Sequence, residues 1–232
     1  MAAFSPSQAI SYGWTNAKQN WKWWIPVMIL YVFINAFPGF FEPAKGQPES
    51  DLYRIIKFIF TIIQIWLVTG ISINTWNMIH GKAPNFKTLF PSFGPVVRNF
   101  LASLVTAVIG GLVAIIIMLI GWMLSQSLGN MIVVIILALI AIALVVVALW
   151  LAIRLSYAPY VAIFDNKWPI DAVKRSWVIT KGNLSTIIWL ALLSLGVVIL
   201  GALALVIGLL WAFPTVMVAN LYLYKHLSEA KS

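Results

Sequence analysis

Residues 165–183 read DNKWPIDAVKRSWVITKGN, and the chain begins with a second copy of their pattern. Each copy is followed by an apolar run long enough to enter a bilayer. The pattern therefore predicts a unit in which a short, basic, tryptophan-bearing helix leads into a membrane span. The shared form P-x-x-A-x-x-x-(G/S)-W-x-x-x-K-x-N pairs Pro6, Ala9, Trp14, Lys18 and Asn20 with Pro169, Ala172, Trp177, Lys181 and Asn183.

The composition indicates an integral membrane protein. Of the 232 residues, 62% are hydrophobic and only 9% are charged, and the mean hydropathy is +0.97. A soluble domain carries about 25% charged residues, so this chain could not cover a water-exposed surface. The absence of cysteine excludes disulfides, thiolate metal sites and cysteine nucleophiles. We expect a lipid bilayer around the chain and no nucleic-acid partner.

The apolar runs predict an all-α fold of six transmembrane helices, arranged as three hairpins in one domain over residues 1–232. No charged residue occurs from Leu184 to Tyr224, a length that suits two spans joined by a turn at Gly201. Amphipathic interfacial helices precede the first and fifth spans. The predicted elements are an interfacial helix at 5–21, spans at about 23–41, 52–79, 99–124, 131–153, 184–200 and 203–225, and a cytoplasmic interfacial segment at 156–183.

Three hairpins of this kind would be parallel repeats related by an axis along the membrane normal. The basic segment 80–98, which we expect on the membrane surface, resembles a degenerate third copy of the unit. In the third span, Ala102, Thr106, Gly110 and Ala114 recur every four residues, a spacing that lets helices approach closely.

The distribution of basic residues predicts the orientation. The chain has 15 lysine and arginine residues. If both termini are cytoplasmic, all of them except Lys45, Arg54 and Lys57 fall on the cytoplasmic side. This is a strong positive-inside bias, so we predict a topology with the N- and C-termini inside. Arg154, at the end of the fourth span, is expected to extend its side chain to the cytoplasmic headgroups.

The sequence offers little that could carry catalysis. The six acids lie outside the middle of every predicted span, and His80 and His226 each stand alone at a span end. The chain contains no H-E-x-x-H, no G-x-S-x-G and no phosphate-binding glycine loop. We therefore expect a protein that is not an enzyme and that holds neither a cofactor nor a metal.

The basic units carry the clearest binding chemistry. Lysine or arginine beside an anionic leaflet contributes about 1 kcal/mol, and tryptophan favours headgroup depth. We expect Asn20 and Asn183 to cap the span that follows each of them. These units either only anchor the helices or bind an anionic phospholipid or a membrane-protein partner. The candidate residues are Trp14, Lys18, Asn20, Lys174, Arg175, Trp177, Lys181 and Asn183.

A second group of candidates is polar and lies within the predicted spans. A transport pathway would require polar groups inside the membrane, but such groups also form hydrogen bonds between helices. No charge accompanies them, which favours the second interpretation. The candidates are Gln64, Ser72, Asn74 and Asn77 in the second span and Asn220 in the sixth.

Residues 160–190, YVAIFDNKWPIDAVKRSWVITKGNLSTIIWL, resemble the A-x-x-x-S-W-x-x-x-K-G-N signature of uncharacterised bacterial integral membrane families. These families include the membrane domain attached to some glycerophosphodiester phosphodiesterases. The segment FPTVMVANLYLYKHL, with Pro214 and Tyr222, is similar to the end of the same group. The resemblance covers about residues 80–227 and implies a six-span protein of the bacterial inner (plasma) membrane. The chain lacks the catalytic domain of those enzymes, so their activity is not implied.

Two functions remain. The favoured one is a non-enzymatic accessory or scaffold protein whose basic, tryptophan-containing cytoplasmic helices bind anionic lipid or a membrane partner. The alternative is a small permease or export component that moves an apolar or amphipathic substrate between its helices. Substitution of Gln64 or Asn74 by leucine would abolish transport only under the second hypothesis.

Overall fold

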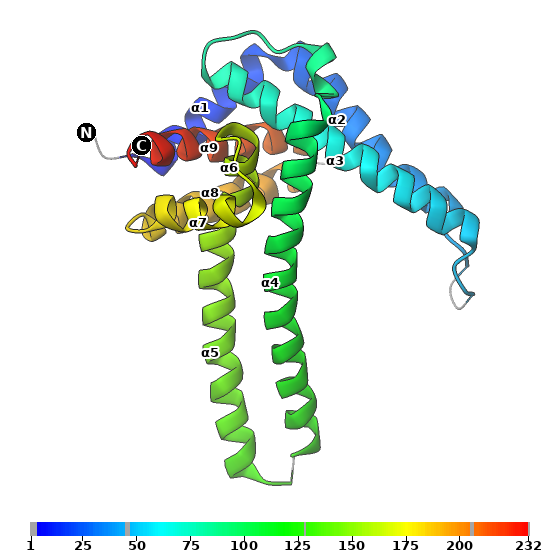
Figure 1. Ribbon diagram of the computed structural model, residues 1–232, viewed down its shortest axis with the longest axis vertical. Coiled ribbons are helices and arrows are strands. Elements are labelled where there is room, and N and C mark those ends of the chain that lie inside the picture. The colour runs from blue at the N-terminus through cyan, green and yellow to red at the C-terminus, as the bar shows by residue number, and fades with distance from the viewer. Residues whose placement is uncertain (1–3, 45–46, 128, 205–206, 232) are drawn as a thin grey trace. The chain divides into compact units, whose positions relative to one another are not determined.

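The computed structural model describes residues 4–44, 47–127, 129–204 and 207–231, and every regular element among them is a helix. The predicted all-α class is therefore confirmed, and Figure 1 shows the elements along the chain. They are α1 (Pro6–Gln19), α2 (Trp21–Ala36), η1 (Phe37–Phe41), α3 (Asp51–Ile79), η2 (Phe86–Leu89), α4 (Phe93–Gln126), α5 (Met131–Leu155), α6 (Ala158–Phe164), α7 (Pro169–Thr180), α8 (Leu184–Leu203) and α9 (Leu209–Glu229).

The chain divides into two compact units. The first contains Met1–Val97 and Ser185–Ser232, and the second contains Arg98–Leu184. In the first unit α9 packs against α1, α2 and α3, and η2 packs against α3. In the second unit α7 packs against α5 and α6. The candidate residues of the two basic helices therefore belong to different units and are described separately.

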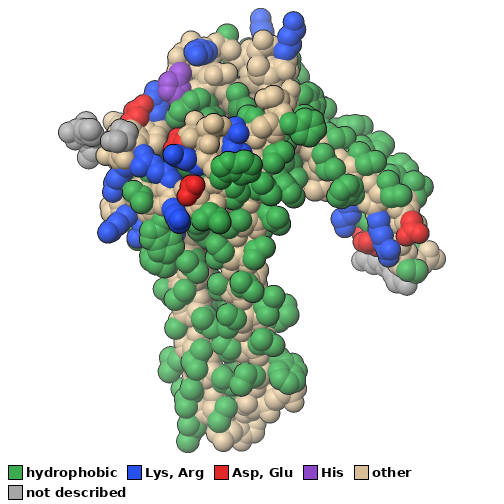
Figure 2. All heavy atoms as spheres, in the orientation of Figure 1, with side chains coloured by type: hydrophobic (Ala, Val, Ile, Leu, Met, Phe, Trp, Pro, Cys, Tyr) green, Lys and Arg blue, Asp and Glu red, His purple; other side chains and the backbone are tan. Residues whose placement is uncertain are grey.

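Within the described residues, five helical segments are long and apolar enough to cross a membrane, which marks the chain as a membrane protein. The most apolar windows of the third and fourth segments have no residue buried inside the protein, and Figure 2 shows hydrophobic side chains along α4 and α5. A helix that is apolar on all sides requires lipid or another protein around it. The five segments are Trp21–Phe41, Asp51–Ile79, Phe93–Gln126, Met131–Phe164 and Leu184–Leu203.

The sixth predicted span, at 203–225, is not among these segments, and its residues 205–206 lie outside the described residues. Helix α9 covers most of that stretch, but Asn220, Lys225 and His226 interrupt its apolar run. Its core side chains are buried against neighbouring helices of the first unit. Six spans, with both termini inside, therefore stay a prediction. Lys45, which the orientation argument uses, also lies outside the described residues.

Proline begins both basic helices. Pro6 is the first residue of α1 and Pro169 is the first residue of α7. Proline suits this position because its fixed φ is already helical and the N–H that it lacks has no partner within the helix. The turn between α6 and α7 places Asn166 at a φ of 56°, a left-handed conformation that asparagine tolerates better than most residues.

Candidate functional site

Helix α1 packs on α9 through its small residues. Ala9 and Ala17 are fully buried, and a Cβ atom on Gly13 would collide with the backbone carbonyl oxygen of Thr215. Glycine at this position therefore lets the two backbones approach closely. Trp14 follows directly but lies off this interface, and it is 42% exposed.

Trp14 lines an apolar groove of about 510 Å³ between α1, α8 and α9. Val197 and Leu200 of α8 and Trp211 of α9 line the same groove. The rings of Trp14 and Trp211 are 6.2 Å apart, and Lys18 Nζ lies 4.9 Å from the centre of the Trp14 ring. An ammonium group held over an exposed indole, beside an apolar groove, can bind an anionic headgroup while the groove takes hydrocarbon.

Helix α7 packs on α5 in the second unit through the aligned positions. Ala172 is fully buried, and the buried Ser176 hydroxyl donates a hydrogen bond of 2.7 Å to the backbone carbonyl of Arg154. Trp177 then meets Trp150 edge to face at 4.9 Å. The small residue of the shared pattern, Gly13 in α1 and Ser176 in α7, thus lies against a backbone carbonyl of another helix. In each helix the tryptophan that follows it lies near another tryptophan.

Arg154 does not extend to water or to headgroups, so the prediction that it does is wrong. It is only 8% exposed, and its guanidinium lies 5.4 Å from the centres of both the Trp150 and the Trp177 rings. It donates to the carbonyl of Trp177 at 3.3 Å and to the hydroxyl of Thr180 at 3.4 Å. Helix α7 folds back over the end of α5, so the two indoles and Thr180 surround this charge in place of solvent.

Of the other basic residues of α7, Lys174 is exposed and Arg175 is half-buried, and a carboxylate accompanies each of them. Lys174 Nζ is 4.0 Å from Asp171, and Arg175 Nε is 3.9 Å from Asp165. An exposed pair such as that of Lys174 and Asp171 contributes about 0–1 kcal/mol. Lys181 is exposed immediately after the helix. The exposed ammonium of Lys174 therefore remains available to a stronger anion at the surface.

Asn20 and Asn183 do not cap the helices that follow them, contrary to the prediction. Asn20 Nδ2 donates to the carbonyl of Asn16 at 3.0 Å, and Asn183 Nδ2 donates to the carbonyl of Ile179 at 3.4 Å. Both bonds return to the preceding helix. The reason is that a helix ends at these positions with unpaired carbonyls, which an amide N–H can satisfy.

The polar candidates in α3 make local and interhelical hydrogen bonds. Gln64 Nε2 donates to Asn35 Oδ1 of α2 at 2.7 Å, and the Ser72 hydroxyl donates to the carbonyl of Val68 at 2.9 Å. Asn77 is half-buried near the end of the helix. In α9, Asn220 Nδ2 donates to its own helix, at the carbonyl of Val216.

Asn74 holds the segment that follows α3. Its Oδ1 accepts from the backbone N–H of Asn85 at 2.8 Å and from the hydroxyl of Thr88 at 2.9 Å, and its Nδ2 donates to the carbonyl of Gly70. A Cβ atom on Gly70 would overlap the backbone of Leu89. The connection is therefore fixed on α3.

Close backbone contacts between segments occur at Gly70, Arg154 and Thr215, and we call these three contacts junctions. A tryptophan stands four residues before each of them in the sequence. Trp66 precedes Gly70, Trp150 precedes Arg154, and Trp211 precedes Thr215. The indole of Trp66 also donates to the carbonyl of Pro91 at 2.7 Å. Each junction therefore combines a tryptophan with a close backbone contact one helical turn later.

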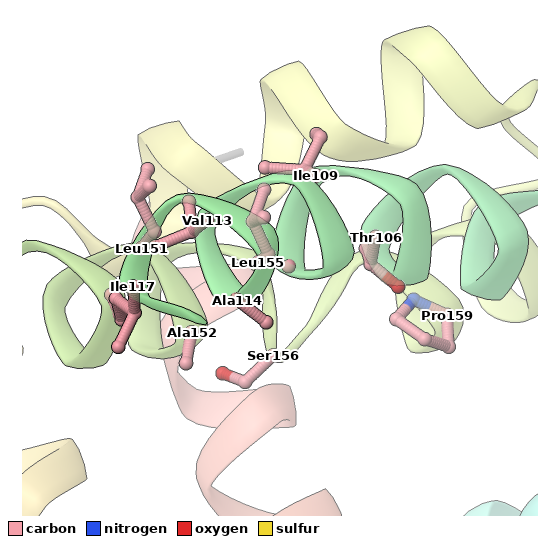
Figure 3. Close-up of a pocket in the computed structure, with 12 residues that line it drawn as sticks. Thr106, Ile109, Val113, Ala114, Ile117, Leu151, Ala152, Leu155, Ser156 and Pro159 are labelled. Atoms are coloured by element: carbon pink, nitrogen blue, oxygen red, sulfur yellow. The ribbon is translucent and has the colours of Figure 1, made fainter. Parts of the chain in front are cut away.

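Small residues of α4 and α5 face one another around a further cavity of about 330 Å³ (Figure 3). Thr106 and Ala114 come from α4, Ala152 comes from α5, and Ser156 directly follows α5. The two hydroxyls donate to carbonyls of α4 and α5 at 2.8 Å. The cavity therefore suits hydrocarbon better than a polar ligand. Across the described parts of the chain, no three histidine, aspartate or glutamate side chains gather as metal ligands.

These features define an all-helical membrane protein whose basic, tryptophan-bearing helices pack against longer apolar helices. The chain belongs to DUF975, a protein family of unknown function, whose match covers residues 15–231. The prediction of an uncharacterised family is thereby confirmed. No curated protein matches the chain, and no solved structure does.

Sequence reasoning missed three residues that the structure brings into view. The burial of Arg154 had a signal, the tryptophan four residues earlier, which repeats at Trp66 and Trp211. Asn16 and Lys82 line a polar cavity between α1 and the end of α3. No sequence pattern predicted this cavity, because the two residues come from segments far apart in the chain.

Proposed function

We propose that the protein is a non-enzymatic membrane accessory or scaffold protein that binds anionic phospholipid through α1 and α7. The observation that carries this proposal is the position of Lys18 over Trp14, at an apolar groove. In this proposal the Lys18 ammonium binds the lipid phosphate, and the Trp14 indole lies at headgroup depth. The apolar groove binds part of an acyl chain. Each basic residue near an anionic leaflet adds about 1 kcal/mol to such binding.

Helix α7 supports the proposal from the second unit. Trp168 and Ile170 are 62% and 65% exposed at its start, where they can enter the interface between lipid and water. Lys174 lies on the same short helix with only a long, exposed contact to Asp171. A phosphate can therefore replace that contact at little cost.

The proposal includes the arrangement in the membrane. Six spans in three repeated hairpins, with both termini cytoplasmic in a bacterial inner (plasma) membrane, agree with the distribution of basic residues. The tryptophan-centred junctions at Gly70, Arg154 and Thr215 support three related repeats. A relationship to the membrane domain of glycerophosphodiester phosphodiesterases would concern the fold and would bring no catalytic residues.

A scaffold is preferred to a small permease because the polar candidates of α3 have partners. Gln64 binds Asn35, and Asn74 binds Asn85 and Thr88. Groups with these bonds stabilise contacts between segments and need no substrate to satisfy them.

Fluorescence quenching tests the proposal. The full chain in mild detergent is titrated with phosphatidylglycerol that carries bromine on its acyl chains, which quenches nearby indoles. We expect stronger quenching than with brominated phosphatidylcholine, and Lys18→Gln should weaken binding while Lys87→Gln, an exposed lysine on η2, should not. Equal quenching by the two lipids in the unmodified protein would contradict the proposal.

A further inference from the structure

An open polar cavity of about 510 Å³ lies on the other side of α1 from the apolar groove, between α1 and the end of α3. Tyr12, Thr15, Asn16 and Gln19 line it from α1, at positions three or four residues apart, and Lys82 lines it from the segment after α3. The cavity therefore collects hydroxyl, amide and ammonium groups on one side of the helix.

The end of α3 fixes where Lys82 stands. Gly81 has a φ of 74°, its N–H donates to the carbonyl of Met78 at 3.0 Å, and the N–H of Lys82 donates to the carbonyl of Asn77 at 2.9 Å. This pair of bonds is the Schellman motif, which ends a helix with glycine in the left-handed region. The backbone of Lys82 is thus held at the cavity.

Asn16 supplies a second indication of a ligand. Its side chain is only 7% exposed, and its Oδ1 has no hydrogen-bond partner among the residues that the structure describes. The Oδ1 atom is itself enclosed, so a ligand in the cavity reaches it only when the Asn16 amide turns over. Buried polar atoms are nearly always bonded, so the missing donor indicates that such a turn accompanies binding.

The charges of the cavity restrict the ligand further. Lys82 is exposed and forms no ion pair with any carboxylate of the described segments. The described residues that line the cavity include no acid. Burial and the nearby phenol of Tyr222 raise the pKa of Tyr12, so its hydroxyl stays neutral. These charges favour an anionic ligand. The hydrogen-bond donors of that ligand should be uncharged hydroxyls, because an ammonium group on the ligand would find no carboxylate in the cavity.

We infer that this cavity binds the phosphate of a hydroxyl-bearing headgroup, with Lys82 on the phosphate and Asn16 accepting from a hydroxyl. The inference rests on the proposed function, because it names a headgroup site beside the groove of Trp14. Phosphoglycerol has this chemistry, whether it is presented by a lipid or by a free phosphate ester. Thr15 and Gln19 can complete the hydrogen bonds at the open side.

Short-chain lipids test the inference, because their headgroups can be exchanged on identical chains. Dihexanoyl phosphatidylglycerol and dihexanoyl phosphatidylcholine are titrated against the full chain in mild detergent by calorimetry. Phosphocholine has no N–H or O–H donor. We expect the glycerol lipid to bind more tightly. Lys82→Gln should weaken its binding by about tenfold, the loss expected for one charge-assisted hydrogen bond, and Lys87→Gln should leave it unchanged.

Asn16→Leu tests the hydroxyl contact separately. It should reduce the preference for the glycerol lipid over the choline lipid, and a thermal melt establishes that the variant is folded. Lys82 is exposed, so Lys82→Gln should not prevent folding. The test with that variant therefore remains decisive even if Asn16→Leu does not fold. Unchanged affinity in Lys82→Gln, or no binding of the glycerol lipid to the unmodified protein, would overturn the inference.

Two further arms identify the source of the headgroup and separate the two proposals. Glycerol 3-phosphate that binds, and loses affinity in Lys82→Gln, would identify a free phosphate ester; binding of the lipid alone would identify a lipid headgroup. If Lys18→Gln weakens binding of the glycerol lipid and Lys82→Gln does not, the cavity is not the site and the proposed function stands. If neither variant weakens it, both proposals fail.

Discussion

The hydroxyl of Ser176 donates a hydrogen bond of 2.7 Å to the backbone carbonyl of Arg154, and this contact joins α7 to the end of α5. Gly13 holds the aligned position in α1 and lies against the carbonyl of Thr215. Two helices far apart in the sequence therefore use the same position of the same pattern to approach the backbone of another helix.

Gly13→Ala should destabilise the first unit, because its new Cβ atom would meet the carbonyl of Thr215 and push α1 from α9. Overpacking of this kind costs about 1–3 kcal/mol, seen as a lower melting temperature in mild detergent. Gly196→Ala is the matched control, since no atom lies within 4 Å of a Cβ placed there. Equal melting temperatures for the two variants would show that α1 is not held by this contact.

Arg154→Lys should destabilise the second unit, although it keeps the positive charge. A lysine ammonium lacks the planar guanidinium that lies 5.4 Å from the centres of both the Trp150 and the Trp177 rings, and the loss should be about 1–2 kcal/mol. A double-mutant cycle with Trp177→Leu measures the coupling by thermal unfolding. Strictly additive effects would rule out the interaction between Arg154 and Trp177 as a source of stability.

Asn74→Leu should destabilise the protein more than Gln64→Leu does. Asn74 is fully buried and bonds Asn85 and Thr88. Its loss leaves the part-buried N–H of Asn85 unpaired, at about 1–3 kcal/mol, whereas the Thr88 hydroxyl keeps its bond to the carbonyl of Asn85. Gln64 is only half-buried, and its bond to Asn35 contributes about 0.5–1.5 kcal/mol.

Melting temperatures compare the two variants, and lipid binding serves as the control for folding. A folded Gln64→Leu protein that has lost transport of an amphipathic substrate in cells would favour the permease hypothesis. Retention of lipid binding by the same variant agrees with the scaffold.

Gly81→Ala should both destabilise the end of α3 and weaken headgroup binding, because φ is 74° at this position. A left-handed conformation costs a residue with a Cβ atom about 1–2 kcal/mol. Calorimetry with dihexanoyl phosphatidylglycerol and a thermal melt measure the two effects. Gly39→Ala, whose Cβ atom would meet nothing within 4 Å, should change neither quantity.

Local sequence patterns predicted the helices well because their causes are local. Pro6 and Pro169 begin α1 and α7, and the long apolar runs become helices. Long-range contacts decided what sequence reasoning missed. Arg154 is buried because α7 returns over it, and an arginine at the end of an apolar run normally extends to water. The site between Asn16 and Lys82 depends likewise on packing of the first unit, which no periodicity shows.

Native mass spectrometry of the protein, released from its own membrane in mild detergent, tests the central claim most directly. The account predicts tightly held anionic phospholipid, which decreases when Lys18, Lys174, Arg175 and Lys181 are changed to glutamine and persists in Lys87→Gln. A protein released without lipid, or one that keeps the same lipid after all four changes, would contradict the claim that its basic helices bind anionic phospholipid.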